Sequence, residues 1–145
     1  MDAFQEYFVD IIKNHYADFE GRARRKEYWM FTLFTFLLSV AIVVFAGIVG
    51  FTISETVGGV LFLLFYLLNL ALLLPSLGLT VRRLHDTGRS GWWALVSFVP
   101  LVGAFVLLYF MVIEGDAGPN TYGPDPKDPY PAGAGIGEFS GVLDR

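Results

Sequence analysis

Hydrophobic residues fill two long stretches of the chain with almost no charge among them. The 52 residues at 29–80 contain one charged side chain, Glu55, and the 22 residues at 92–113 contain none. A charge at the middle of a bilayer costs at least ~2.5–3.5 kcal/mol on insertion scales, so charged residues are expected outside the spanning segments. The pattern therefore predicts an integral membrane protein.

Polar and turn-forming residues divide this apolar sequence into three expected spans, at about residues 29–53, 60–81 and 92–113. A helix of about 25 residues rises roughly 37 Å, which is enough to cross a hydrocarbon core of ~30 Å. Residues 54–59 form a short turn, and residues 82–91 form a polar loop. We therefore expect an all-α fold with three transmembrane helices in one membrane domain, residues 22–113.

The N-terminal segment, residues 1–21, has the period of an amphipathic helix over residues 2–19. Its apolar stripe consists of Phe4, Tyr7, Phe8, Ile11, Ile12, His15 and Phe19. Residues 1–20 contain five acidic side chains and one lysine, whereas helices that lie on lipid present Lys and Arg to it. We expect the stripe to dock on the span ends beside the basic loops. A lipid-surface anchor and a disordered end are the alternatives.

The last 32 residues, 114–145, differ sharply in composition from the rest of the chain. They contain five of the seven prolines and seven of the sixteen glycines. Such a segment cannot bury enough apolar surface to form a packed core. We expect a largely irregular C-terminal tail.

The distribution of Lys and Arg predicts the orientation in the membrane. Five lie in residues 1–28, three in the loop at 82–91, and two in the tail. Cytoplasmic loops carry an excess of these residues. With three spans, the N-terminus and the middle loop would lie in the cytoplasm, and the C-terminus outside.

The chain has no cysteine and only two histidines, His15 and His85. Disulfides and thiolate chemistry are therefore excluded, and a multi-histidine metal site within one chain is implausible. We expect no catalytic residue, no metal and no cofactor. Nucleic-acid binding is not expected either, because no recognised fold or stacking surface accompanies the basic residues.

Two basic clusters should face the same cytoplasmic surface. They comprise Arg22, Arg24, Arg25 and Lys26 before the first span, and Arg82, Arg83 and Arg89 in the loop. One interpretation is that they only fix topology, with Asp86 pairing with Arg82 or Arg83. The other is that they bind anionic phospholipid, because guanidinium groups suit phosphate. Catalysis by His85 and Asp86 is the weakest interpretation, since no nucleophile accompanies them.

Four ordered motifs extend from about Phe19 to Pro126. Residues 19–29 fit F-x-G-R-x-x-R-x-E-[FY]-W, and residues 82–93 fit R-R-x-H-D-x-G-x-S-G-W-W. Residues 100–103 contain a proline–glycine element, and residues 120–126 fit N-x-Y-G-x-x-P. Together they resemble the bacterial inner-membrane family called domain of unknown function 805. The motif positions are His85, Asp86, Gly88, Trp92, Trp93, Asn120 and Tyr122.

This resemblance implies a small multi-span protein of the inner membrane with no assigned activity or catalytic residues. We expect a non-enzymatic structural or regulatory partner whose basic cytoplasmic face binds anionic lipid or an acidic partner. A small transporter or channel built by oligomerisation is the alternative. The sequence leaves open a homo-oligomer or a membrane-protein partner.

Overall fold

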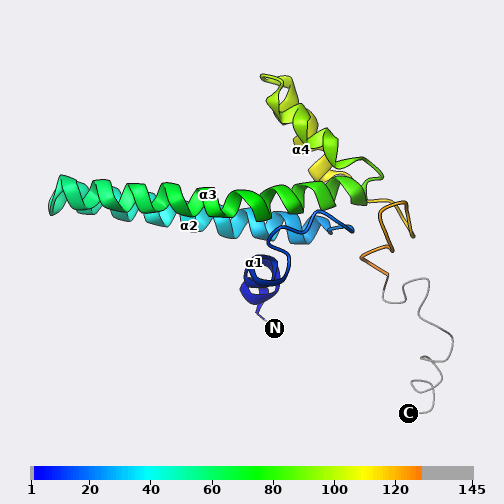
Figure 1. The fold of residues 1–145 in the computed structure, drawn as a ribbon, viewed down its shortest axis with the longest axis horizontal. Helices are drawn as coiled ribbons and strands as arrows, with labels where there is room; N and C mark the ends of the chain where they lie inside the picture. Colours follow the sequence, from blue (N-terminus) through cyan, green and yellow to red (C-terminus); the bar gives the residue numbers. More distant parts are fainter. Residues whose placement is uncertain (1, 129–145) are drawn as a thin grey trace, which may run out of the picture.

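The computed structural model describes residues 2–128, and within them every regular element is helical. The elements are η1 (Gln5–Val9, a π-helix), α1 (Asp10–Asn14), α2 (Arg25–Thr52), α3 (Glu55–Asp86), η2 (Gly91–Phe98, a 3₁₀-helix) and α4 (Val102–Val112). Helices α2 and α3 form a long antiparallel pair. In Figure 1, η1–α1 lies on one side of this pair and η2–α4 projects from the other. The all-α prediction is confirmed.

Helices α2 and α3 are each long enough to cross a membrane. Their 28 and 32 residues rise roughly 42 and 48 Å at 1.5 Å per residue. Only 11% of the most apolar window of each helix is buried within the protein. Both helices extend beyond the expected apolar boundaries, because regular backbone continues into the polar ends at Arg25 and Asp86. The apolar outer faces suit lipid tails.

The two long helices lie backbone to backbone near the short turn that joins them. A Cβ atom built on Gly58 would lie 2.5 Å from the Cα atom of Gly50. Ala46, one turn before Gly50, is fully buried. Small residues let membrane helices pack backbone to backbone, which gains van der Waals contact where no hydrophobic driving force exists.

The N-terminal arm, η1–α1, docks on the pair through its apolar stripe. Phe8 and Ile11 belong to a buried cluster completed by Ala23, Phe31, Leu72 and Leu79. The ring of Phe8 stacks on that of Phe31, with centroids 5.5 Å apart. The predicted docking of the stripe on the spans is confirmed, and the disordered alternative is wrong.

The N-terminal helix ends at Asn14 and not at Phe19 as expected. His15 leaves helical geometry at φ −128° and ψ 30°. Its Nδ1 lies 2.8 Å from the Asp18 carboxylate, which also accepts the Glu20 N–H. These local side-chain bonds compete with the helical hydrogen bonds and end the helix.

The expected third span is wrong, because residues 92–113 form two short helices that fold back on each other. The chain reverses after Pro100 at Leu101, which has φ 62° and ψ −56°. The Val102 N–H donates to the Pro100 carbonyl at 2.7 Å, which closes a γ-turn. The 11 residues of α4 rise only about 16 Å, roughly half of a bilayer core.

Both ends of this η2–α4 hairpin lie at the same end of the long pair. At its start, Gly91 lies against Val81 of α3. Beyond its end, the Asp116 N–H donates to the Asp86 carbonyl of α3 at 2.7 Å. The described part of the tail therefore starts beside the N-terminal basic segment. The prediction that these two segments lie on opposite sides of the membrane depended on a third spanning helix, which residues 92–113 do not form.

Substitution of the buried Phe8 tests whether apolar packing holds the N-terminal arm on the long pair. Phe8→Ala should weaken docking by about 3–5 kcal/mol, because it removes a buried aromatic ring and leaves a cavity. Limited proteolysis of the purified protein should then cut near Gly21 much faster than in the wild type. Gln5→Ala, at an exposed position of the same arm, is the control and should not change the rate.

Candidate functional site

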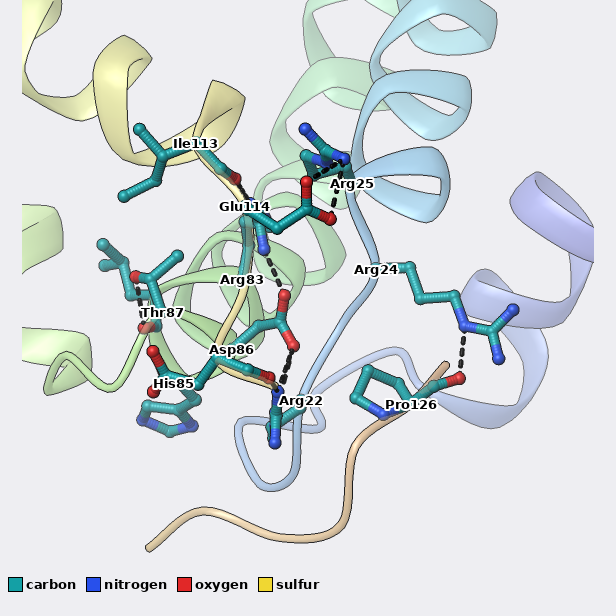
Figure 2. Close-up of polar contacts among 12 residues, drawn as sticks. Arg22, Arg24, Arg25, Arg83, His85, Asp86, Thr87, Ile113, Glu114 and Pro126 are labelled. Carbon is teal, nitrogen blue, oxygen red and sulfur yellow. Dashed lines mark hydrogen bonds and ion pairs between the residues drawn. The ribbon is translucent and has the colours of Figure 1, made fainter. Parts of the chain in front are cut away.

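A buried ionic group joins three distant parts of the chain at the polar end of the long pair. This arginine junction consists of Arg22, Arg83 and Asp86. Asp86 lies between the two guanidinium groups, as Figure 2 shows. Its Oδ1 accepts from Arg22 Nε at 3.0 Å, and its Oδ2 accepts from Arg83 Nη1. The side chains are almost wholly inaccessible, with 1% of Arg22, 0% of Arg83 and 3% of Asp86 exposed.

Backbone carbonyls at the end of α4 and in the tail accept further hydrogen bonds from both guanidinium groups. Arg22 Nη1 donates to Gly118 O, and Arg22 Nη2 donates to Asp116 O, each at 2.6 Å. Arg83 donates to the carbonyls of Met111 and Ile113. A buried ion pair is favourable only when such extra bonds are present, because desolvation otherwise exceeds the attraction. The tail residues therefore complete the junction.

The turn after α3 brings the tail close to Asp86. Gly88 has φ +68°, a left-handed conformation that glycine adopts without strain. The Gly88 and Arg89 N–H groups donate to His85 O and Leu84 O at 3.0 Å, which caps α3. A Cβ on Gly88 would also lie 2.6 Å from the carboxylate of Asp116. Glycine is needed here for its left-handed conformation.

A second layer of contacts holds the tail from outside. Both oxygens of Glu114 lie 2.9 Å from Arg25 Nη2, and Lys127 Nζ donates to the same carboxylate. Arg24 Nε donates to the carbonyl of Pro126. The hydrogen bond from Lys127 and the charge of Arg25 lower the pKa of Glu114. This contact is thus present at neutral pH and is lost as the pH falls through that lowered pKa.

His85 binds the tail through its ring. It stacks on Tyr122 with centroids 3.9 Å apart and an interplanar angle of 5°. Its Nδ1 lies 3.1 Å from the carbonyl of Gly21. Asn120 Nδ2 donates to the His85 carbonyl at 2.9 Å, and the Tyr122 N–H donates to Asn120 Oδ1. The motif residues Asn120 and Tyr122 therefore contact the motif residue His85 directly.

This geometry does not assemble a His85–Asp86 catalytic pair. Both oxygens of Asp86 are occupied by arginines, and the His85 ring faces Gly21 and Tyr122. The arrangement instead cross-links the segment at Arg22, the end of α3 and the tail.

The seven candidate lipid-binding residues separate into buried and accessible groups. Arg22, Arg82 and Arg83 are buried. Arg24 and Lys26 are exposed, and Arg25 and Arg89 are partly exposed. Lys26 Nζ lies 5.1 Å from the centre of the Tyr7 ring, and the Arg89 guanidinium lies 4.3 Å from that of Phe110. The motif tryptophans Trp92 and Trp93 remain exposed, at 78% and 47%.

Sequence reasoning identified Asp86 as a partner for Arg82 or Arg83 but did not find its bond to Arg22, which is 64 residues away. It also missed the carbonyl acceptors at Met111, Ile113, Asp116 and Gly118. Backbone carbonyls leave no trace in side-chain patterns. One sequence signal could have pointed to these contacts. The arginine-containing motifs at residues 19–29 and 82–93 occur in the same chain as the tail motif at residues 120–126.

Comparisons with known proteins agree with the motifs that meet at the junction. Residues 16–124 match the family described as protein of unknown function (DUF805), and the chain belongs to this family. It is 48% identical to the inner membrane protein YhaI of Escherichia coli K12, over 84% of this chain and 96% of that protein. It is 36% identical to the inner membrane protein YhaH of the same strain, over 84% and 97%. No solved structure matches.

This chain is therefore an inner membrane protein of the DUF805 family, and its two long apolar helices indicate more than one crossing.

We expect a large loss of folding stability when the single carboxylate of the arginine junction is removed. Asp86→Asn leaves two buried guanidinium groups without a counter-charge and should destabilise the fold by about 3–5 kcal/mol. Thermal unfolding in detergent should show a much lower midpoint, and the tail should become sensitive to protease. Asp116→Asn, at an exposed position, should change stability by less than ~0.5 kcal/mol. Equal behaviour of the two variants would contradict the role of Asp86.

Proposed function

We propose that this protein is a non-enzymatic inner-membrane component whose exposed basic residues bind anionic phospholipid at the cytoplasmic surface. The residues that would make the contact are Arg24, Lys26 and the partly exposed Arg25 and Arg89. The buried arginines instead hold the chain together. The protein would act as a structural or regulatory partner of other membrane components.

One observation carries this proposal: accessible cations and accessible indole rings occur at the same end of the long pair. Trp29 follows Lys26 by one turn of α2 and is 38% exposed. Trp92 and Trp93 follow Arg89 and are also exposed. Tryptophan favours the headgroup level, and nearby Lys and Arg add about 1 kcal/mol each toward an anionic surface.

The topology that fits this proposal has two crossings, with both chain ends in the cytoplasm. The eight Lys and Arg of residues 1–28 and 82–91 lie at the polar end, and the turn at residues 53–54 lies at the other end. The η2–α4 hairpin would enter the cytoplasmic leaflet without crossing. Its uncharged tip exposes Phe98, Leu101 and Phe105, which suits lipid contact.

Reporter fusions test this topology. A fluorescent reporter that matures only in the cytoplasm should be bright at the N-terminus and also after Arg145. The same reporter between Ile53 and Ser54 should be dark, while alkaline phosphatase inserted there should be active. If the N-terminal fusion is bright and the C-terminal fusion is dark, the chain crosses the membrane an odd number of times, which contradicts the proposal.

The lipid contact is tested by removing exposed cations that lie outside the junction. Arg24→Gln combined with Lys26→Gln should lower retention of phosphatidylglycerol in native mass spectra by roughly thirtyfold, at about 1 kcal/mol per cation. The thermal midpoint should fall only slightly, because the variant also loses the Arg24–Pro126 hydrogen bond and the contact of Lys26 with the Tyr7 ring. Lys13→Gln, an exposed lysine of α1, is the control and should retain lipid normally. If the double variant retains as much phosphatidylglycerol as the wild type, these residues do not bind lipid and serve only to fix the topology.

A small oligomeric transporter or channel is the second candidate, and one observation favours it. A cavity of about 310 Å³ between α2 and α3 is lined by Thr32, Thr35, Ser76 and Thr80 among apolar neighbours. However, Thr35, Ser76 and Thr80 donate to carbonyls of their own helices. Solute flux into proteoliposomes separates this candidate from the first.

A further inference from the structure

A polar cavity lies beneath the docked N-terminal arm, apart from the arginine junction. Its volume is about 320 Å³, which is large enough for a small organic molecule. The arm supplies Glu6, Asp10 and His15, and the long pair supplies Glu27 and Arg82. Arg22 borders it from the junction side. Side chains far apart in sequence thus surround one polar space at the end of α2 and α3.

Arg82 is the unusual group in this cavity. The residue is 6% exposed, and its Nε and Nη2 atoms are buried without a hydrogen-bond partner among the described residues. Its neighbour Arg83, by contrast, has three partners. A buried guanidinium without acceptors is costly, and its two unpaired N–H groups match two oxygens of an anion. Arg82 is therefore poised to receive an anionic group.

The other charged side chains around the cavity disfavour a ligand that carries only negative charge. Arg22 is already compensated by Asp86, and the cavity is also lined by Arg82 and by the carboxylates of Glu6, Asp10 and Glu27. His15 lies 3.9 Å from Asp10 and 2.8 Å from Asp18. A pure anion would be repelled by three carboxylates, and a pure cation by Arg82. A molecule that carries both charges satisfies both sides.

We propose that this cavity binds a small zwitterion that carries a phosphate and a primary ammonium group, as phosphoethanolamine does. The phosphate binds the guanidinium group of Arg82, and the ammonium lies among Glu6, Asp10 and Glu27. Glu27 is two residues before the exposed Trp29, so the cavity lies near the headgroup level of the proposed orientation. The same group is available from bilayer phosphatidylethanolamine and from free phosphoethanolamine.

Binding to the full-length protein in detergent tests the proposal with both sources. Native mass spectrometry with equal phosphatidylethanolamine and phosphatidylglycerol of matched acyl chains measures lipid retention. Calorimetry with phosphoethanolamine and with inorganic phosphate measures the free ligands. The wild type should prefer the ammonium-bearing member of each pair. Preference seen only for the lipid assigns the bilayer as source, and preference seen only in calorimetry assigns the free molecule.

Arg82→Gln should weaken binding of the preferred ligand by about tenfold or more, because two charge-assisted hydrogen bonds are lost. Without ligand, this variant should unfold at a temperature close to that of the wild type, because the buried Nε and Nη2 of Arg82 make no hydrogen bond that would be lost. The control Lys13→Gln removes one positive charge from the same arm outside the cavity and should bind normally.

A second variant keeps the test decisive if Arg82→Gln does not fold. Glu6→Gln combined with Asp10→Asn should abolish the preference for phosphoethanolamine over phosphate, because it removes two of the carboxylates around the ammonium. The double variant should fold, because both side chains lie on the surface arm. Three outcomes overturn the proposal: no preference for the ammonium-bearing ligand in either the lipid pair or the free pair, unchanged binding in Arg82→Gln, or a preference that survives in the double variant.

Discussion

The fold depends on one carboxylate that neutralises two buried guanidinium groups. Asp86 lies between Arg22 and Arg83, and the N–H groups that it leaves unpaired reach carbonyls of the chain beyond α4. Because a buried cation without partners is very costly, the tail must return to this point. That requirement keeps both ends of the η2–α4 hairpin at the same end of the long pair.

The arm and the tail are held by different kinds of interaction. The N-terminal arm docks mainly through aromatic and aliphatic burial, with Phe8 stacked on Phe31. The tail docks through hydrogen bonds and ion pairs, with few buried apolar side chains beyond Met111. Salt and acid should therefore loosen the tail before the arm, since screening acts on exposed pairs such as Arg25–Glu114 and hardly on apolar contacts.

Sequence reasoning predicted the helical class, the two long helices and the docked stripe, because these follow from periodic apolar residues. It failed at residues 92–113, where composition alone fits a span. The reversal there arises from Pro100 and a positive φ at Leu101, and leucine is not a residue that signals such a turn. The junction was only partly foreseen, since its acceptors are backbone atoms and Arg22 is distant in sequence.

The long separation between Arg22 and its acceptor Gly118 has a consequence for biosynthesis. The two residues are 96 positions apart, so at ~5–20 residues per second the ribosome takes roughly 5–20 s to reach the second after the first. During that interval Arg22 has no tail carbonyl to bind, and its guanidinium is an exposed cation of the kind that favours the cytoplasmic side of a membrane. Once the tail emerges, the same guanidinium becomes buried in the cross-link.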